Sequence, residues 1–426
     1  MTPELRLIQG EASAAQTRPS LVLVPPAGRV RLGVKKMTRI KRAQDFVEIL
    51  AWSTVLAVVT MFLLDGAIAR ITDWPSGLSA VSRLTALVAT DLLLIHMLLV
   101  ARVPWLDKLY GHDKTTVAHK KLGKPILYLV IVHFLASTIG FAIADGKTIV
   151  DEFLFMVTKI QDMLTATAAL VLMIIVVVTS IKVARKKLSY EAWYIIHLLS
   201  YGAVLLAVPH QFSTGSDIAG KPLQQAFWII LYVFVAGNIL WYRALQPIVS
   251  SLSKNLRVET VVSESSETES VSIAGKNLEK LHFQAGQFFL LRILTARQWW
   301  RPHPFSVSAA PNGKFVRFSI GNRGDDTALM PNLKPGTRVI LEGPYGVFTE
   351  ERRSREKVVL IAAGIGVPPI RALAESMTAR PGDVTIIYRT SRADDAALLD
   401  ELKEISRRRG FALHVMDGPR AHPQSW

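Results

Sequence analysis

The chain of 426 residues contains no cysteine. This absence excludes disulfide bridges, a catalytic thiol, thiolate ligation of haem and iron–sulfur clusters held by cysteine. Any electron-transfer chemistry in this chain would therefore depend on other ligands and on organic cofactors.

Acidic residues are scarce, with 34 Asp and Glu against 50 Lys and Arg, and the net charge is +16. Such a balance can indicate nucleic-acid binding. Here, however, much of the excess lies in the N-terminal segment and in loops between apolar stretches, where membrane topology and anionic lipid account for it. We expect a lipid bilayer, and no nucleic acid, as a partner.

Long apolar runs are concentrated before Pro247, and the sequence after it is typical of a soluble protein. Six runs are long enough to cross a bilayer. They are Leu50 to Ala67, Leu84 to Val103, Pro125 to Ala144, Met163 to Ile181, Trp193 to Val208, and Ala226 to Trp241. The pattern predicts an all-α membrane domain of six helices over residues 48–250.

Basic residues follow these runs asymmetrically. They gather before the first run, between the second and third, and after the fourth, whereas the alternate loops carry few. By the positive-inside rule both termini are expected to be cytoplasmic, in a multi-pass protein of the plasma membrane. Residues 1–47 are expected to form a disordered basic arm, since the start is polar, aperiodic and lacks the order of a cleavable signal.

Four histidines lie in two of the apolar stretches: His119 and His133 are 14 residues apart, and His197 and His210 are 13 apart. At about 1.5 Å per residue each interval is roughly 20 Å, so two facing helices could hold two haems, one near each side of the bilayer. Histidine inside a membrane is costly and is a common axial ligand of haem iron. The competing interpretation is that they are packing or helix-end histidines.

The expected orientation pairs His119 with His197 at the inner haem and His133 with His210 at the outer one. Fourteen residues return to the same helix face, but thirteen do not, so Pro209 is expected to bend or unwind the helix and re-aim His210. Two further histidines have no partner at matching spacing. His96 is expected to pack or support a ligand, and His112 is expected to be solvated.

Short alternating runs after residue 250 predict an antiparallel β-barrel over 251–350. The runs are Leu256 to Val262, Ser270 to Ala274, Gln287 to Ile293, Phe315 to Ile320, and Thr337 to Glu342. Within this region stands Arg-Pro-His-Pro-Phe-Ser, residues 301–306. Ser306 offers a hydroxyl that could bond a flavin ring edge. Taken alone, the motif is equally compatible with an edge strand interrupted by proline.

A nucleotide-binding pattern occupies residues 351–426. A continuous apolar strand at 357–363 is followed by Gly-Ile-Gly-Val-Pro-Pro, residues 364–369, and a helical run to Met377. A strand, a glycine turn and a helix N-terminus form a phosphate cradle, although such turns also occur for purely structural reasons. A second strand, Val384 to Tyr388, leads into Arg389 and Arg392, placed to contact a ribose or its 2′-phosphate unless the loop is simply solvated.

The specific motifs occur in a fixed order. After the two histidine pairs come His-Pro-Phe-Ser at 303–306, Gly-Asp-Asp-Thr at 324–327, Gly-Pro-Tyr-Gly at 343–346, and Ala-Ala-Gly-Ile-Gly-Val-Pro-Pro at 362–369. From about Lys41 to its end the chain resembles the bacterial branch of the ferric reductase and NADPH oxidase superfamily. That resemblance implies a membrane domain of six helices with two b-type haems, joined to a flavoprotein module similar to ferredoxin-NADP reductase.

The resemblance also implies roles for individual residues. His303, Pro304, Phe305 and Ser306 would line FAD, with Ser306 as the catalytic contact. Gly324 and Thr327 would lie near the flavin phosphates, and Gly343, Tyr345 and Gly346 would close the flavin site. The turn at Gly364, Gly366 and Pro369, with Arg389 and Arg392, would hold NAD(P)H.

Three positions depart from the family pattern. Pro368 replaces a threonine after the glycine turn, and Gly321 stands where relatives carry an arginine, which leaves Arg323 as a candidate phosphate contact. The sequence ends at Trp426, shortly after the run Ala412 to Met416, so the nucleotide domain looks truncated. We therefore expect haem and FAD binding but little haem reduction by NAD(P)H, restored by appending the C-terminal segment of a relative.

These observations predict a membrane oxidoreductase. It would carry electrons from cytoplasmic NAD(P)H through FAD and two haems to an external acceptor, either ferric iron or dioxygen. FAD is needed because nicotinamide delivers two electrons and haem accepts one. Two alternatives use the same histidines: a non-enzymatic di-haem subunit completed by a partner reductase, and a quinone-linked cytochrome b.

Overall fold

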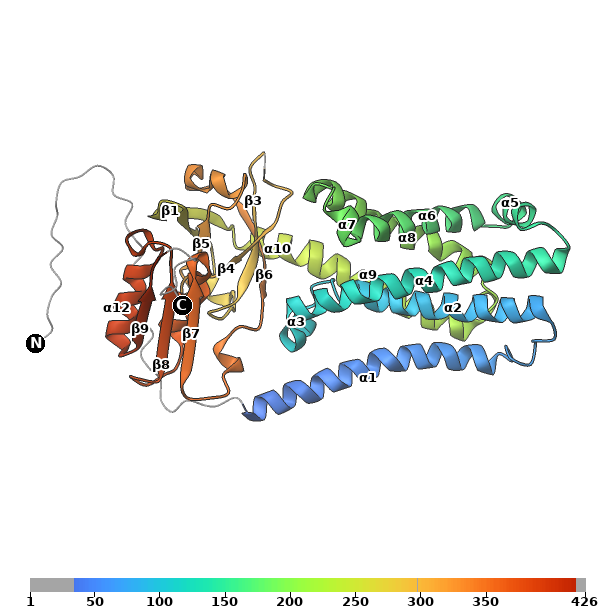
Figure 1. The fold of residues 1–426 in the computed structure, drawn as a ribbon, viewed down its shortest axis with the longest axis horizontal. Helices are drawn as coiled ribbons and strands as arrows, with labels where there is room; N and C mark the ends of the chain where they lie inside the picture. The colour runs from blue at the N-terminus through green and yellow to red at the C-terminus, as the bar shows by residue number, and fades with distance from the viewer. Residues whose placement is uncertain (1–33, 297, 419–426) are drawn as a thin grey trace, which may run out of the picture. The chain divides into compact units, whose positions relative to one another are not determined.

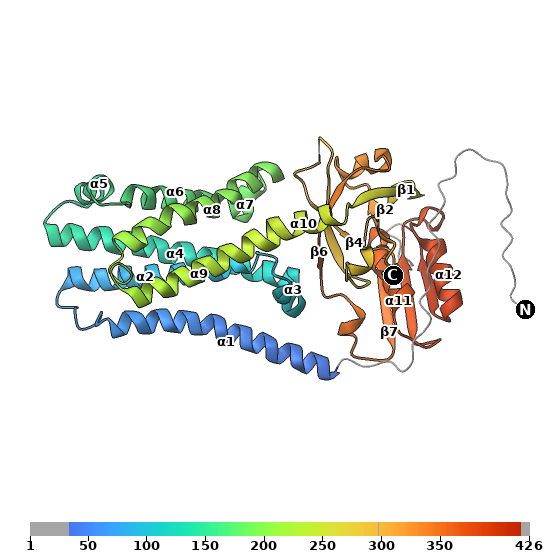
Figure 2. The ribbon, with the colours of Figure 1, turned by 180° about the vertical axis from the view of Figure 1, so that it is seen from behind.

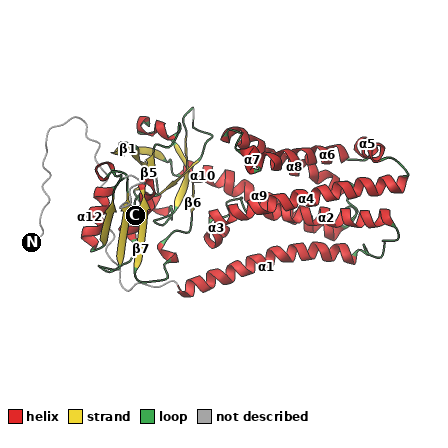
Figure 3. Cartoon of the chain, in the orientation of Figure 1, coloured by secondary structure: helices red, strands yellow, loops and turns green. Residues whose placement is uncertain are grey.

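A computed structural model describes residues 34–296 and 298–418. The chain divides into two compact units, one of Ile40–Ala244 and one that includes Leu245 onward. Figure 3 shows that the first is built of helices and that the strands belong to the second. The predicted boundary between flavin and nucleotide halves at residue 350 falls inside this second unit and stays a prediction.

Six long helices form the first unit (Figure 1). They are α1 (Val34–Leu64), α2 (Trp74–Leu98), α4 (His112–Asp145), α6 (Met163–Ser180), α8 (Tyr190–Ser213) and α9 (Pro222–Leu240). Each is long and apolar enough to cross a membrane. The prediction of a six-helix, multi-pass membrane domain is thus confirmed. Within the bundle α2 packs on α4 and α9, and α6 packs on α8.

Shorter elements connect these helices. They are α3 (Pro104–Tyr110), α5 (Ile149–Lys159), α7 (Lys182–Arg185) and a π-helical turn at Trp241–Leu245, which leads into α10 (Gln246–Ser253). Helix α3 begins at Pro104 because proline suits the first helical position. The second predicted span therefore ends at Leu98 and not at Val103.

Helix starts are set by capping residues that hydropathy does not register. Helix α2 begins ten residues before the predicted Leu84 because Asp73 accepts a hydrogen bond from the backbone of Ser76 at 2.9 Å in a capping box. Helix α1 begins at Val34, so residues 34–47 of the predicted disordered arm are helical. Lysine and arginine have high helix propensity, so the basic residues before the first apolar run join its helix. Residues 1–33 lie outside the described part of the chain.

The expected unwinding at Pro209 is wrong. Helix α8 continues through this proline to Ser213, and the carbonyl of His210 accepts a bond from the backbone of Thr214 at 3.0 Å. His210 therefore reaches its position on an unbroken helix.

The flavin half of the second unit contains two three-stranded antiparallel sheets, with orders β1-β2-β5 and β4-β3-β6. Their strands are β1 (Arg257–Ser265), β2 (Thr268–Ala274), β3 (Phe288–Ile293), β4 (His303–Ser306), β5 (Phe315–Gly321) and β6 (Val339–Tyr345). Isolated bridges join the sheets at Arg257 with Arg338 and at Val307 with Phe318. All five predicted runs are strands. Sequence periodicity missed β4, an edge strand that tolerates Pro304.

The nucleotide half is a parallel sheet of order β7-β8-β9, formed by β7 (Val358–Ala363), β8 (Val384–Arg389) and β9 (Ala412–Met416). Helix α11 (Val367–Ser376) lies across one face (Figure 2) and packs against α12 (Leu399–Arg409). An unbroken apolar run such as residues 357–363 predicts a strand that is buried on both faces of a parallel sheet. Within the described residues, however, Val359 and Ile361 are exposed while Leu360 and Ala362 are buried under α11.

Four buried charged side chains join the two halves of this unit. Arg317 of β5 donates two hydrogen bonds of 2.8 Å to Glu401 of α12. Arg371 of α11 lies 2.7 Å from the same carboxylate and is ion-paired with Glu375 one turn further along its helix. The four side chains are between 1% and 9% exposed, so the two guanidiniums and two carboxylates compensate one another away from water.

This network predicts a particular dependence of stability on pH. Burial acts to raise the pKa of Glu401, but hydrogen bonds from Arg317 and the positive charges of Arg317 and Arg371 outweigh it and hold that pKa at about 2, against an ordinary 4.5. A carboxyl with a lowered pKa in the folded state stabilises the fold above its unfolded pKa, and this contribution is lost as pH falls through the folded value.

We therefore expect the free energy of unfolding of this unit to decrease from pH 4.5 toward 2 more steeply in the wild type than in Glu401→Gln. Denaturant titrations of the full-length chain at steps across this range, followed by hydrogen exchange in β5 and α12, provide the comparison. Equal pH slopes would contradict the assignment.

Candidate functional site

Two histidines from facing helices approach each other at one end of the helical unit. The ring centres of His119 on α4 and His197 on α8 are 6.0 Å apart, and the ring planes are inclined at 69°. Two imidazole nitrogens that bind one transition-metal ion at about 2.0–2.1 Å stand about 4 Å apart, with ring centres further out. The spacing of this pair therefore suits a single metal ion between them.

A backbone carbonyl orients His119. Its Nδ1 lies 3.1 Å from the carbonyl oxygen of His96 on α2, which can only accept a hydrogen bond. The proton must then be on Nδ1. The Nε2 atom keeps its lone pair and makes no hydrogen bond within residues 34–296 or 298–418.

Ser180 fixes His197 in the same tautomer. The Ser180 hydroxyl donates to the carbonyl of Val176 at 2.7 Å and accepts from the indole Nε1 of Trp193 at 3.2 Å. Because its single proton is committed, the remaining contact, His197 Nδ1 at 3.2 Å, must be a donor. Trp193 also stacks on the His197 ring, with centres 5.0 Å apart.

In the second pair, His133 and His210, a hydrogen bond orients only the first histidine. His133 Nδ1 lies 3.0 Å from the carbonyl oxygen of Ser82 on α2, so it too donates and leaves Nε2 available. The Nδ1 atom of His210, by contrast, is buried and makes no hydrogen bond to a described residue. Three of the four predicted ligands are thus oriented by hydrogen bonds.

His96 and His112 differ in position. The ring of His96 stacks on that of His119, with centres 3.6 Å apart and planes inclined at 20°. His112 is the first residue of α4 and is half-buried. The structure therefore places His96 directly behind a candidate ligand, where it packs and supplies the orienting carbonyl, whereas the expectation that His112 is solvated holds only in part.

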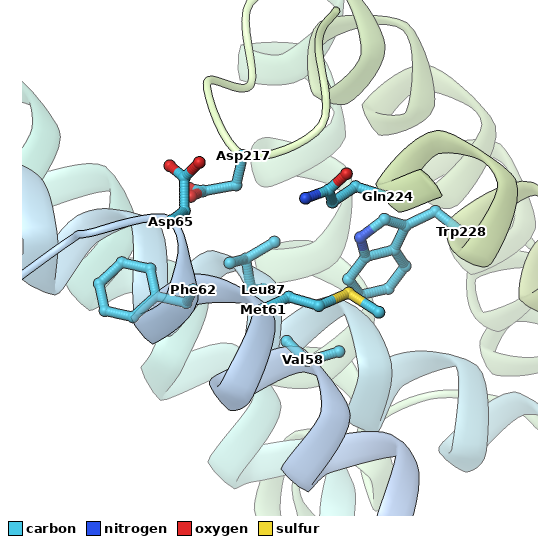
Figure 4. A pocket seen from close by; sticks show the side chains of 8 residues that line it. All are labelled: Val58, Met61, Phe62, Asp65, Leu87, Asp217, Gln224 and Trp228. Carbon is cyan, nitrogen blue, oxygen red and sulfur yellow. The ribbon is translucent and has the colours of Figure 1, made fainter. Parts of the chain in front are cut away.

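A small pocket lies among α1, α2, α9 and the loop before α9 (Figure 4). Its lining includes the carboxylates of Asp65 and Asp217 and the indole of Trp228. Both carboxylates are already paired: Arg83 donates to Asp217 at 2.7 Å, and Lys221 lies 2.7 Å from Asp65 and, with burial opposing it, lowers the pKa of that carboxyl. Among the described residues, no group of three or more His, Asp or Glu side chains is placed to hold a bare metal ion.

The candidate flavin contacts lie along β4 and the end of β6. Strand β4 pairs with β3, where Ser306 stands opposite Phe288. Ser306 is half-buried, and its hydroxyl makes no hydrogen bond to any described residue. His303 Nε2 lies 3.1 Å from the carboxylate of Asp326, which also pairs with Arg301 at 3.0 Å. The carboxylate thus ties β4 to the segment that carries the Gly-Asp-Asp-Thr motif.

The remaining flavin candidates form tight turns. Thr327 donates to the carbonyl of Gly324 at 2.9 Å, which closes the turn over which the flavin phosphates are expected. Gly346 has a φ of +92°, and a side chain there would approach the Phe288 ring at 3.1 Å, so glycine is required. Tyr345 is buried and donates to Glu342 at 3.0 Å. Its ring therefore supports the turn from inside the barrel.

The glycine turn between β7 and α11 is open. Gly364 and Gly366 are exposed, and no heavy atom lies within 4 Å of a side chain built at either. Val367 donates to the carbonyl of Gly364, and the prolines at 368 and 369 have no N–H. The anion cradle predicted here thus reduces to the backbone N–H groups of residues 364–366.

Of the two predicted arginines, Arg389 is the last residue of β8 and Arg392 follows the strand. Arg389 donates to the carbonyl of Gly418 at 3.2 Å. Arg392 is exposed and pairs with Asp394 at 3.0 Å, which lowers the pKa of that carboxyl. A 2′-phosphate would have to compete with Asp394 for the guanidinium of Arg392.

Sequence reasoning missed the side chains that orient the ligands. Ser82 and Ser180 lie in apolar helices that carry no histidine pair, and the carbonyl of His96 leaves no mark in a side-chain pattern. Arg317 and Glu401 are 84 residues apart. Only the tertiary fold brings such residues to their partners.

Comparisons with known proteins agree with this architecture. Residues 85–208 match the family model described as ferric reductase like transmembrane component, and residues 253–349 match an FAD-binding domain. The chain is 25% identical over 302 residues to a superoxide-generating NADPH oxidase heavy chain of Dictyostelium discoideum, covering 61% of this chain and 41% of that protein. It is 23% identical over 318 residues to ferric reduction oxidase 7, chloroplastic, of Arabidopsis thaliana, covering 68% and 40%. It spans about two fifths of each.

Among solved structures, the flavohaem-like FAD/NAD-binding domain of nitric oxide dioxygenase from Vibrio cholerae matches at a TM-score of 0.35 and 24% identity. That match covers 40% of this chain and 76% of the solved domain.

The helical unit and the sheets together define a multi-pass membrane protein that also carries an FAD-binding domain. By these matches the chain is similar to members of the ferric reductase and NADPH oxidase superfamily.

Proposed function

We propose that this protein is an oxidoreductase of the plasma membrane that carries electrons from cytoplasmic NAD(P)H, through FAD and two b-type haems, to an acceptor outside. Both termini face the cytoplasm in this proposal. Ferric iron and dioxygen are the candidate acceptors, in keeping with the names of the two relatives.

The observation that carries the proposal is that three of the four candidate ligands donate their Nδ1 proton in a hydrogen bond. In His119, His133 and His197 this proton is donated to an acceptor on a neighbouring helix, and Nε2 makes no hydrogen bond to a described residue. Ligating histidines almost always donate their other ring N–H in this way. A pair of imidazoles is too few to hold a bare metal ion, but it would suit a haem, whose macrocycle would provide the remaining ligands of the iron.

Two levels of ligands support transfer across the membrane. The inner pair is His119 with His197, and the outer pair is His133 with His210, 14 and 13 residues further along α4 and α8. At about 1.5 Å per residue this separates the levels by roughly 20 Å.

The bound cofactors would supply the redox chemistry: FAD takes a hydride from nicotinamide and passes electrons one at a time to haem. The chain itself binds and orients. The unbonded hydroxyl of Ser306 is available to the flavin ring edge, and the open turn at Gly364 and Gly366 offers backbone N–H groups to a pyrophosphate.

Cofactor analysis of the purified chain tests this proposal. We expect FAD in stoichiometric amount together with haem, and reduction of that FAD by NAD(P)H under anaerobic conditions. Haem without FAD would instead favour the di-haem subunit completed by a partner reductase. Absence of both cofactors would refute each of these functions.

The choice between NADPH and NADH gives a further prediction. If Arg392 pairs with a 2′-phosphate, Arg392→Ala should raise the KM for NADPH about tenfold, because a charge-assisted hydrogen bond to the phosphate is lost. The KM for NADH should be unchanged. Arg407→Ala, which removes an exposed, ion-paired arginine from α12, is the matched control. Equal losses with both nucleotides would remove Arg392 from the site.

A further inference from the structure

The buried network of Arg317, Glu401, Arg371 and Glu375 also contacts the chain just beyond the candidate flavin strand. Arg317 donates to the carbonyl of Ser308 at 3.0 Å and to its hydroxyl at 3.2 Å. Glu375 accepts a hydrogen bond from the backbone N–H of Ala310 at 2.6 Å. Both contacts fall on residues 308–310, which begin two residues after Ser306.

The other side of the network starts at the nucleotide turn. Helix α11 follows directly on Gly364–Gly366, and Arg371 lies on its second turn, fully buried. Arg371 contacts Glu401 and Glu375, and these carboxylates contact Arg317 and Ala310. A continuous path of ion pairs and hydrogen bonds therefore runs from the helix that follows the candidate pyrophosphate turn to residues 308–310, just after the candidate flavin strand.

We propose that Arg317, Arg371, Glu375 and Glu401 are positioning residues that hold the nucleotide half in register with β4, so that the nicotinamide meets the flavin ring. This inference rests on the proposed function. It assigns to these four residues no contact with either cofactor, only control over the distance and angle between the two half-sites.

Charged groups suit such a role better than an apolar contact. Apolar side chains of similar volume would often be as stabilising, but they can slide over one another. The bidentate contact between Arg317 and Glu401 fixes both distance and direction, because the planar guanidinium matches the carboxylate at two points. Small errors in position are costly for hydride transfer, with about 1 Å worth up to a hundredfold in rate.

Glu401→Gln in the full-length protein tests the proposal, since it keeps the side-chain shape and removes the charge shared by both arginines. We expect anaerobic flavin reduction by NAD(P)H to slow at least tenfold while FAD content stays at the wild-type level. Glu404→Gln, three residues along the same helix and ion-paired with arginines at the surface, is the matched control and should leave the rate unchanged. Arg317→Lys, which keeps the charge but loses the bidentate contact, should give a smaller loss in the same direction.

Hydrogen exchange supplies a readout that needs no activity. The Ala310 amide bonds to Glu375 and does not touch Glu401, so faster exchange of the peptide that contains it in Glu401→Gln would show that the network acts as a unit. Strands β1 and β2 should exchange as in the wild type.

The outcomes separate the two proposals. An unchanged rate of flavin reduction, unchanged exchange at Ala310, or loss of rate only in proportion to loss of FAD would each overturn the positioning role. If Glu401→Gln does not fold, the same readouts on Arg317→Lys decide. A wild-type chain whose FAD is not reduced by NAD(P)H would refute the proposed function, and exchange at Ala310 would still test the network.

Discussion

Replacement of His119 or His197 by alanine is expected to remove the inner haem and to leave the outer one in place. Replacement of His133 or His210 should do the reverse, because each haem loses one of its two axial bonds. Each single variant should therefore contain about half the haem of the wild type. The haem content of dithionite-reduced, purified protein measures this directly.

A matched control is available on the same helix. His112 is the first residue of α4, seven positions before His119, and lies outside both pairs. His112→Ala should retain the full complement of haem, which would show that loss of a histidine from α4 does not by itself disturb the bundle. Full haem content in any one of the four ligand variants would contradict that ligand's assignment.

Ser306→Ala is expected to slow the reduction of bound flavin by NAD(P)H by about two- to tenfold without changing haem content. The hydroxyl is half-buried and makes no hydrogen bond to a described residue, so its removal leaves no unpaired protein group. The loss would then report on a hydrogen bond to the flavin, for which about 0.5–1.5 kcal/mol, or up to tenfold, is typical.

Stopped-flow absorbance of the flavin under anaerobic conditions measures this rate. Ser263→Ala, at an exposed position of β1 in the same half of the module, is the matched control. If Ser306→Ala reduces its flavin as fast as the wild type, Ser306 does not contact the reacting ring.

The membrane helices were predictable because burial in lipid imposes one dominant requirement, about 20 apolar residues in succession. The ends of these helices were not predictable from hydropathy, because they depend on local capping. Asp73 and Ser76 start α2 by mutual hydrogen bonds, and Pro104 starts a new helix where hydropathy continues. Pro209 is a proline that does not end a helix. Helix α8 continues through it, although sequence rules treat a proline inside a helix as a break.

The candidate ligands were predictable from spacing, but the groups that orient them were not. A histidine pair at 14 residues is visible in a sequence, whereas the acceptor of the His119 proton is a backbone carbonyl 23 residues away. Ser180 gains its role only because Val176 accepts its single proton and Trp193 donates to it. Such functions arise from proton donors and acceptors meeting in the fold, and no residue pattern encodes them.

The parallel sheet shows the same contrast between features that are local in the sequence and contacts that form only in the fold. Strand, turn and helix follow from an apolar run, two glycines and a proline-capped helix start, all local features. The neutral network of Arg317, Glu401, Arg371 and Glu375 depends on three elements far apart in sequence. Each of these residues alone resembles an ordinary surface charge, and only burial distinguishes them.

The central claim is that electrons pass from bound flavin to the haems held by the two histidine pairs. Light-driven reduction of the bound FAD, with no NAD(P)H present, tests it most directly when the haem absorbance is followed in the same anaerobic sample. Our account predicts that haem reduction follows flavin reduction, and that the haems stay oxidised in protein stripped of FAD. A flavin that is fully reduced beside haems that remain oxidised would contradict it.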